Sequence, residues 1–297
     1  MRFFMLTTLL LVAAINVTLA CECGMEGSSG RIYKGTKVRA NKYPWLAHIR
    51  SFADRDDNSF GQCGGSLIDE THVATAAHCV VTKDGQRYKP ENIDVFLGRV
   101  KAFSDFSYPH KVSKVWFDPK YDSSNLSNDF AILTLSKPVK FTQTIAPVCL
   151  PNNESDLTKL TVSGWGLTSA NAKSSDDLLE VEVDFMDKEE CNDAKKTIIM
   201  KQNDIPIELA PLIRTEPVAE SHMCAINKKT RGDACSGDSG GPIMHHGDNG
   251  RWYLMGVVSG SWTECGQDKD TSGLYTRTLY YKDVIKSIAP NACWQDL

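Results

Sequence analysis

The 297-residue chain has no run of lysine and arginine, no internal repeat and no low-complexity tract. Its formal charge is −4 at pH 7, so neither nucleic acid nor an anionic membrane surface is an expected partner. After the first twenty residues no segment is apolar enough to span a bilayer. Zinc-ligand spacing is missing too, because the one close cysteine pair, Cys21 and Cys23, is too short for a zinc knuckle. The composition is that of a packed globular protein.

The first twenty residues have the pattern of a secretory signal peptide. Arg2 precedes an apolar run over residues 3–14, and small residues flank a cleavage site after Ala20. The competing interpretation is an uncleaved signal anchor, which the polar interruptions and the short length of the run disfavour. All ten cysteines follow residue 20, an even number in a chain that we expect to be exported, so disulfides are favoured over free thiols.

From residue 32 onward, short β-branched and aromatic runs alternate with turn-forming clusters. These runs are residues 72–76, 92–97, 130–135, 160–163, 179–185, 252–259 and 274–278. Their spacing favours an all-β sandwich or a pair of barrels. Helical periodicity is persuasive only over residues 280–288, before Pro290. We expect residues 21–31 to be a short tail and the polar stretch 197–220 to be a surface loop.

Ser239, within the run GDSGGP of residues 237–242, is the first sign of chemistry. Glycine permits tight turns that bring amide N–H groups close to a substrate carbonyl. A serine between glycines is usually only part of a loop, so a nucleophile also needs a base and an acid that orients the base. His78 in the run TAAHC and Asp129 in the run NDFAIL are the candidates, although each residue type is usually structural when it stands alone.

In the chain order His78, Asp129, Ser239, these motifs together resemble those of the chymotrypsin and trypsin family of serine proteases. The resemblance extends over essentially the whole chain from Arg31 and includes the runs YPW, CGGSLI and SGWG. It implies an all-β fold of two six-stranded antiparallel β-barrels with a C-terminal α-helix. The site would lie between the barrels, with the histidine and the aspartate from the first and the serine from the second.

The resemblance also implies a role for each of these residues. Ser239 would attack the scissile carbonyl, His78 would take its proton and later protonate the leaving amine, and Asp129 would hold the imidazolium. The backbone N–H groups of Gly237 and Ser239 would form the oxyanion hole. Catalysis of this kind needs no metal or cofactor.

Arg31 and Ile32 match the activation site of the family, where cleavage after a basic residue creates a new α-amino group. In the family this ammonium group pairs with the acid that precedes the nucleophile, which is Asp238 here. Because a buried carboxylate without a partner is costly, we expect the uncut chain to be a weakly active zymogen. The chain would then consist of a signal peptide (residues 1–20), a propeptide (21–31) and a protease domain (32–297).

Asp233 matches the acid at the base of the primary specificity pocket in trypsin-like members, and Gly273 matches a glycine of the pocket wall. A carboxylate at the base would pair with lysine or arginine of a substrate. The other wall is harder to align, because one residue is inserted between Ser259 and Cys265. Either Ser259 keeps the serine position of the family, or the wall shifts to residues 261–262; we favour Ser259, because residues 256–259 match the preceding strand.

Family pairing implies three disulfides, which are Cys63–Cys79, Cys191–Cys224 and Cys235–Cys265. Cys149 matches the cysteine that holds the propeptide in chymotrypsin-like relatives, so we expect Cys21 or Cys23 to bond it. The remaining one would reach Cys293. The loop between residues 97 and 112 lacks the glutamates that bind calcium in trypsins, so no calcium site is expected.

Asn125 and Asn153 each begin an Asn-x-Ser pattern, the acceptor for N-glycosylation in a secreted chain. The sequence thus predicts an extracellular, monomeric serine endopeptidase that cleaves protein or peptide substrates after arginine or lysine. Its other partners would be an activating protease and protein protease inhibitors. Two alternatives stay open: an active enzyme with altered primary specificity, and a catalytically silent homologue that binds partners through the same fold.

Overall fold

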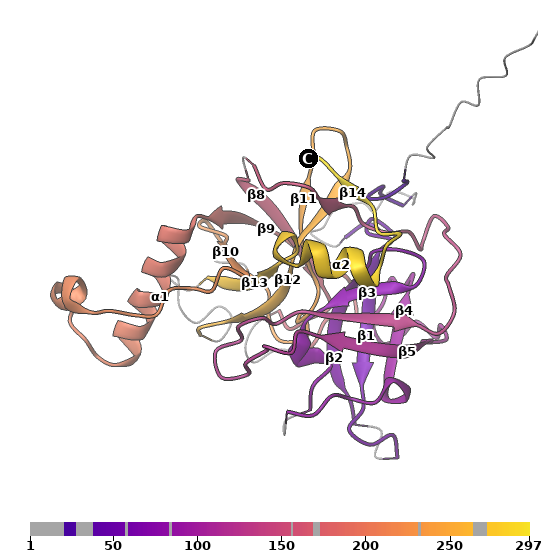
Figure 1. The fold of residues 1–297 in the computed structure, drawn as a ribbon, viewed down its shortest axis with the longest axis horizontal. Coiled ribbons are helices and arrows are strands. Elements are labelled where there is room, and N and C mark those ends of the chain that lie inside the picture. The colour runs from indigo at the N-terminus through magenta and orange to yellow at the C-terminus, as the bar shows by residue number, and fades with distance from the viewer. Residues whose placement is uncertain are drawn as a thin grey trace, which may run out of the picture.

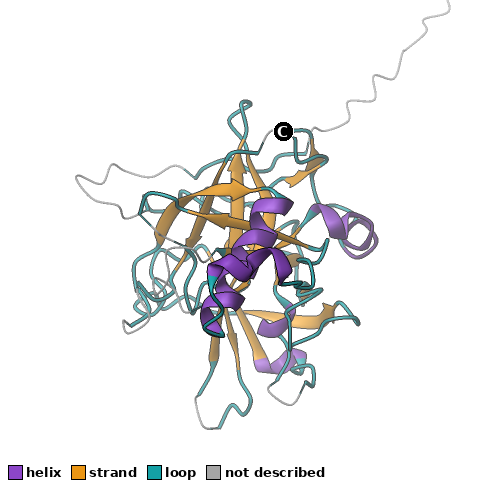
Figure 2. Ribbon diagram, turned by 90° about the vertical axis from the view of Figure 1, so that its left-hand side faces the viewer, coloured by secondary structure: helices purple, strands orange, loops and turns teal. Residues whose placement is uncertain are grey.

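The computed structural model describes residues 21–27, 38–56, 59–82, 85–155, 157–168, 173–230, 233–263 and 272–297. Within these ranges, twelve strands close into two barrels of six strands each (Figure 1). Figure 2, seen from another side, shows that strands dominate and that helices are few. The double-barrel, all-β fold with a C-terminal helix is therefore confirmed.

The first barrel has the strand order β1-β2-β3-β6-β5-β4, and every neighbouring pair is antiparallel. Its strands are β1 (Leu46–Ser51), β2 (Gly61–Leu67), β3 (His72–Thr75), β4 (Ile93–Leu97), β5 (His110–Phe117) and β6 (Ala131–Leu135). Every residue of the short strands β3 and β4 is buried. In a barrel of this size the inward-facing side chains fill the interior. Closure leaves no free sheet edge.

The second barrel has the strand order β10-β13-β12-β11-β8-β9. Its strands are β8 (Lys159–Gly164), β9 (Leu179–Met186), β10 (His222–Ile226), β11 (Pro242–His246), β12 (Trp252–Ser261) and β13 (Gly273–Arg277). A separate pair of short parallel strands, β7 (Leu150–Pro151) and β14 (Trp294–Gln295), joins the segment between the barrels to the C-terminus.

All seven predicted strand runs are confirmed, as β3, β4, β6, β8, β9, β12 and β13. The prediction missed five of the twelve barrel strands and the short pair β7 and β14. In β2 the reason is visible, since Gly64 and Gly65 are residues that strands disfavour. A Cβ atom on Gly64 would lie 2.7 Å from Cα of Gly241, so this glycine lets the second barrel approach the first.

The predicted C-terminal helix is present as η4 (Leu279–Tyr281) followed by α2 (Lys282–Ile288). It packs on the core of the first barrel rather than the second. Tyr281 stacks on Phe130 with ring centroids 4.4 Å apart, and Ile285 is fully buried. The chain therefore returns from the second barrel to brace the first. Within the described ranges, no helix has the length and apolar character needed to cross a membrane.

The prediction of a surface loop over residues 197–220 is wrong in its first part, because the helix α1 (Lys188–Gln202) runs into it. Figure 1 shows α1 projecting to one side of the barrels. The helix has few buried apolar residues and no clear amphipathic period, so periodicity could not find it. Asp187 caps it by accepting a hydrogen bond from the Glu190 N–H at 2.8 Å, and this Asp-x-x-Glu spacing was a readable start signal.

Residues 21–27 form no helix or strand but are fastened to the body of the protein. Disulfides join Cys23 to Cys149 and Cys21 to Cys293. Directly after Cys23, the Gly24 N–H donates to the Pro147 carbonyl at 2.9 Å. Gly24 has a φ of +67°, and a Cβ atom there would lie 2.4 Å from a backbone oxygen, so no other residue fits without displacement.

Gly24→Ala is expected to lower the free energy of unfolding by about 1–3 kcal/mol, because it adds a backbone clash to an unfavourable φ. Gly250→Ala is the matched control, since Gly250 has a φ of +75° but a Cβ atom there would have nothing within 4 Å. Urea denaturation of both variants measures the difference. An equal loss in the two would mean that residues 21–27 do not pack as described.

Candidate active site

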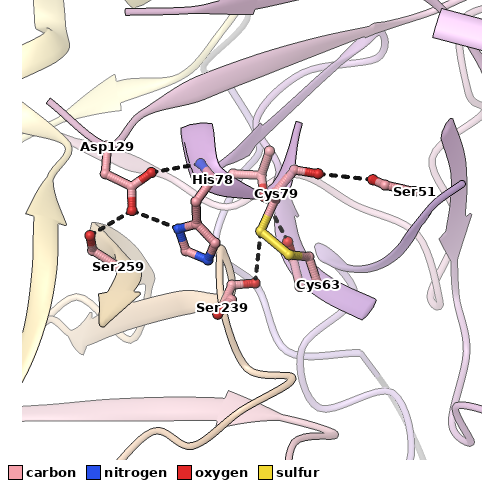
Figure 3. The surroundings of a disulfide bond; sticks show 9 residues. Ser51, Cys63, His78, Cys79, Asp129, Ser239 and Ser259 are labelled. Atoms are coloured by element: carbon pink, nitrogen blue, oxygen red, sulfur yellow. Dashed lines mark hydrogen bonds and ion pairs between the residues drawn. A yellow bond between two sulfur atoms is a disulfide. The ribbon is translucent and has the colours of Figure 1, made fainter. Parts of the chain in front are cut away.

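The pairing of β3 with β6 brings the predicted histidine and aspartate together. Thr75 lies opposite Ala131 in this pair, so the residues just after β3 and just before β6 share one end of the barrel. His78 lies there in the short helix η1 (Ala77–Cys79). Its backbone N–H and its ring Nδ1 both contact the carboxylate of Asp129, at 2.9 and 2.7 Å (Figure 3).

Asp129 is fully buried, whereas the His78 side chain keeps a quarter of its surface exposed. Burial alone would lower the pKa of His78, but the charge of Asp129 and the hydrogen bond to it outweigh burial, so the pKa is raised above its ordinary value. With Nδ1–H donating to the carboxylate, the neutral ring has its lone pair on Nε2. That nitrogen is then free to accept a proton.

Two residues of the second barrel complete the surroundings of Asp129. Ser259 donates its hydroxyl to the carboxylate at 2.6 Å, and Thr276 donates to the backbone carbonyl of Asp129 at 2.8 Å. Ser259 lies in β12 and Thr276 in β13. The aspartate is thus held by both barrels, and its carboxylate has no water-exposed face.

Ser239 lies on the side of the imidazole that faces away from Asp129 (Figure 3). Its loop leads into β11, whose pairing with β12 sets it at the same end of the second barrel as Ser259. The Ser239 carbonyl accepts a hydrogen bond from the Gly64 N–H at 2.7 Å, which fixes the loop against the first barrel. The Ser239 hydroxyl makes no hydrogen bond to a described residue, and such contacts often tighten only when substrate binds.

The backbone around Ser239 adopts conformations that glycine permits. Gly237 has a φ of +97° and Gly240 a φ of +73°. The turn is closed by the Asp238 N–H, which donates to the Cys235 carbonyl at 2.9 Å. Within the described residues, the N–H groups of Gly237 and Ser239 have no acceptor. Two unpaired amides beside one serine can bind an anionic oxygen.

Asp238, the residue before Ser239, lines a cavity of about 200 Å³. It accepts hydrogen bonds from the N–H groups of Gly166 and Cys235, at 2.7 and 3.0 Å. Burial raises the pKa of Asp238 to about 6. No cationic side chain among the described residues pairs with it. The predicted partner Ile32 and its neighbour Arg31 lie outside the described residues.

Asp233 lines the same cavity as Asp238. Its carboxylate accepts hydrogen bonds from the Tyr275 hydroxyl and from the Ala234 N–H, at 2.5 and 2.7 Å. Burial raises the pKa of Asp233 to about 6, and the nearby charge of Asp238 adds to the effect. A Cβ atom on Gly273 would come within 2.4 Å of this carboxylate, so the glycine leaves the acid its space.

Ser259, the residue that we favour for the other pocket wall, contacts the carboxylate of Asp129. The pairing of β12 with β13 shifts its register at Ser259, between Val258 and Gly260, and Ser261 then pairs with Gly273. Trp262 packs instead beside Leu274 and the Cys191–Cys224 disulfide, away from Asp129.

Four disulfides are seen in the described residues, and all coincide with expected pairs. Cys63–Cys79 braces the histidine helix, and Cys191–Cys224 anchors α1 to β10. Cys235 is also disulfide-bonded, but its expected partner, Cys265, lies outside the described residues.

Among the described residues, one cluster brings three potential metal ligands together. Cys63, Cys79 and His78 bring their ligand atoms within 4.8 Å, but a disulfide has no thiolate to give. In the loop after β4, the guanidinium of Arg99 already occupies the interior and donates to the carbonyl of Ala102 at 2.9 Å. This internal cation thus holds the loop together through backbone carbonyls.

The sequence did not identify three residues that shape the site. Tyr275 holds Asp233, and Gly166 binds Asp238 through its N–H. Leu126 packs on Gly260, which follows Ser259 in β12; a Cβ atom on that glycine would lie 2.6 Å from Cδ1 of Leu126. The run SGWG contained a signal for Gly166, but nothing local marks the two others, since both contacts join distant segments.

A model of the trypsin family matches residues 32–285 of the chain. The chain belongs to the trypsin family. This family match covers both barrels and ends within the helix α2.

Several proteins are similar to this chain in sequence. Clotting factor C of Tachypleus tridentatus is 31% identical over 268 residues, which cover 84% of this chain and 25% of that protein. Transmembrane protease serine 11G of Mus musculus is 30% identical over 273 residues, covering 90% and 58%. Clotting factor G beta subunit of Tachypleus tridentatus is 30% identical over 276 residues, covering 90% and 82%. The chain thus spans only a quarter to three fifths of the first two.

The raised pKa of Asp238 predicts how the stability of the uncut chain depends on pH. Because the folded pKa of about 6 exceeds the ordinary 3.8, folding favours the protonated form, and stability is lost as pH rises through about 6. Asparagine does not titrate. In Asp238→Asn the decline of the unfolding free energy between about pH 4 and 7 should therefore be smaller by about 1–3 kcal/mol. Denaturant titrations across this range measure it.

Asp233→Asn is the parallel variant, because its pKa is also raised to about 6. In this variant too, the decline of the unfolding free energy with rising pH should be smaller than in the unsubstituted chain. A pH profile identical to that of the unsubstituted chain in both variants would contradict the burial of the two charges.

Proposed function

We propose that this trypsin-family chain is a secreted serine endopeptidase, made as a zymogen, that hydrolyses peptide bonds after arginine or lysine. The observation that carries the proposal is the orientation of His78, which is held by buried Asp129 on one side and has Ser239 on the other. That transmembrane protease serine 11G, a similar chain, is named a protease supports the same class of reaction.

In the proposed reaction, Nε2 of His78 removes the hydroxyl proton of Ser239 as its oxygen attacks the scissile carbonyl carbon. The developing imidazolium is stabilised by the carboxylate of Asp129, which stays ionised. The imidazolium then gives the proton to the leaving amine, and an acyl-enzyme forms. Water repeats the sequence, with His78 as base and then as acid, and frees the carboxylic acid.

The negative oxygen of each tetrahedral intermediate would be bound by the N–H groups of Gly237 and Ser239. Their lack of other acceptors among the described residues supports this role, because no existing bond must be broken. One such donor contributes roughly 3–4 kcal/mol to transition-state stabilisation. The positive φ of Gly237 aims its amide, so the glycine acts through its backbone.

The proposed preference for arginine and lysine rests on Asp233 at the base of the pocket, beside Gly273. Its pKa of about 6 belongs to the empty pocket, and a bound guanidinium or ammonium would favour the ionised form. Ser259 contributes to the opposite wall in this proposal. Binding of basic side chains should therefore strengthen as pH rises through about 6.

Cleavage after Arg31 would free the ammonium group of Ile32. The cavity that holds Asp238 supports this proposal, because its carboxylate is buried and has no cationic partner among the described residues. An ion pair there would order the turn that carries Gly237 and Ser239. The bonds Cys23–Cys149 and Cys21–Cys293 would keep the cut propeptide attached.

The proposed setting is extracellular, with residues 1–20 removed as a signal peptide. The partners would be an activating protease, protein or peptide substrates and protein protease inhibitors. The disulfides of the structure are consistent with an oxidising compartment. Asn125 and Asn153 would carry N-linked glycans there.

The direct test is to cleave the purified chain after Arg31 and compare it with uncut chain and with cleaved Ser239→Ala. Substrates with Arg, Lys, Phe or Ala before the scissile bond are used. We expect the cleaved chain to hydrolyse the Arg and Lys substrates, and Ser239→Ala to lose at least about ten-thousandfold in kcat. Equal rates for the two would favour a silent homologue, and a preference for Phe would favour the altered specificity.

Gly273→Ala tests the pocket without touching the catalytic residues. The added methyl must displace the carboxylate of Asp233, so kcat/KM for Arg and Lys substrates should fall by about 100-fold. Tyr275→Phe removes a hydrogen bond to Asp233 but adds no atoms, so kcat/KM for the same substrates should fall by about tenfold or less. Unchanged Arg hydrolysis in Gly273→Ala would place the basic side chain elsewhere.

A further inference from the structure

The loop that leads into Asp129 is held in a closed turn. The Asp122 N–H donates to the Ser127 carbonyl at 3.1 Å, and the side chain of Asn128 donates to the Lys120 carbonyl at 3.1 Å. Asn125 is exposed within this turn. It also begins the Asn-Leu-Ser acceptor pattern of residues 125–127.

The Asn125 amide is oriented on both sides. Its Oδ1 accepts a hydrogen bond from the Ser127 N–H at 2.8 Å, and its Nδ2 donates to Asp122 at 3.1 Å. An amide nitrogen has two hydrogens, so one remains for replacement by a sugar while the bond to Asp122 persists. A glycan attached here would start from an amide group whose orientation these two hydrogen bonds hold.

This turn lies at the rim of the proposed cleft. Leu126, the next residue, packs on Gly260 of β12, which directly follows the serine that contacts Asp129. The attachment atom is thus one residue from the wall of the site and four residues from Asp129. A bulky, hydrated glycan at this position has the cleft entrance as its neighbour.

We infer that an N-linked glycan on Asn125 screens the cleft by size, admitting short or extended peptides and slowing the docking of bulky proteins. The inference rests on the proposed protease function and adds a regulation of the same site. Rigid protein inhibitors, which must fit the rim as well as the pocket, would be affected most. The chemical class of the modification is carbohydrate on an amide nitrogen.

The second acceptor, Asn153, offers a matched control. Its neighbour Glu154 pairs with Arg277, at one end of β13, whereas Gly273 beside Asp233 is at the other. Five residues of strand separate the two ends by roughly 13 Å. A glycan on Asn153 would therefore be of the same kind but distant from the cleft.

The test uses the full chain secreted from glycosylating eukaryotic cells and cleaved after Arg31, with site occupancy read by mass spectrometry. Ser127→Ala removes the acceptor pattern but leaves Asn125 and its two hydrogen bonds in place. Asn125→Gln and enzymatic deglycosylation are independent routes to the same state, and Asn153→Gln is the control. The probe is a Kunitz-type protein inhibitor, whose association rate is measured beside kcat/KM on a tripeptide substrate.

We expect Asn125 to be occupied, and its unglycosylated forms to bind the inhibitor at least about tenfold faster with tripeptide hydrolysis within about twofold. Asn153→Gln should change neither quantity. An unmodified Asn125, or equal association rates in all forms, would overturn the inference. Inhibitor association measures binding, so it tests the effect of the glycan on access to the cleft even if the chain hydrolyses no peptide. A failure of peptide hydrolysis would count against the proposed function alone.

Discussion

Asp129 is fully buried, and its carboxylate accepts two hydrogen bonds from His78 and one from Ser259. A buried charge of this kind is tolerated only when it is well bonded. Here the donors come from both barrels, so the cost of burying the charge is offset only when the barrels are docked and the imidazole is turned correctly. The same hydrogen bonds to Asp129 therefore hold the two barrels together and orient His78, the proposed base.

The second barrel has the opposite situation, because Asp233 and Asp238 share a cavity without a cation among the described residues, and each pKa is raised to about 6. The charge of Asp238 contributes to the raised pKa of Asp233. An ammonium group bound by Asp238 would remove that repulsion and favour the ionised form of Asp233. Activation would then favour the binding of basic substrates in two ways. It would order the turn that carries Ser239, and it would favour the ionised form of Asp233.

Local patterns were sufficient for much of this structure. The seven predicted strands carry their own β-branched runs, and the motifs around Ser239 and His78 are short. The contacts that complete the site are not local: Ser259 lies 130 residues from Asp129, and Tyr275 lies 42 residues from Asp233. The glycine-rich strand β2 was missed because glycine has a low strand propensity. Gly64 is needed there because the second barrel comes close to it.

The central claim is that Asp129 and His78 make Ser239 a nucleophile once the chain is cut after Arg31. A fluorophosphonate, which reacts with activated serines, tests it most directly when the adduct is located by peptide mass spectrometry. We expect one adduct, on Ser239, in the cut chain, and its loss in cut His78→Ala and cut Asp129→Ala. An unlabelled Ser239 in the cut chain, or labelling that persists without His78, would contradict the claim.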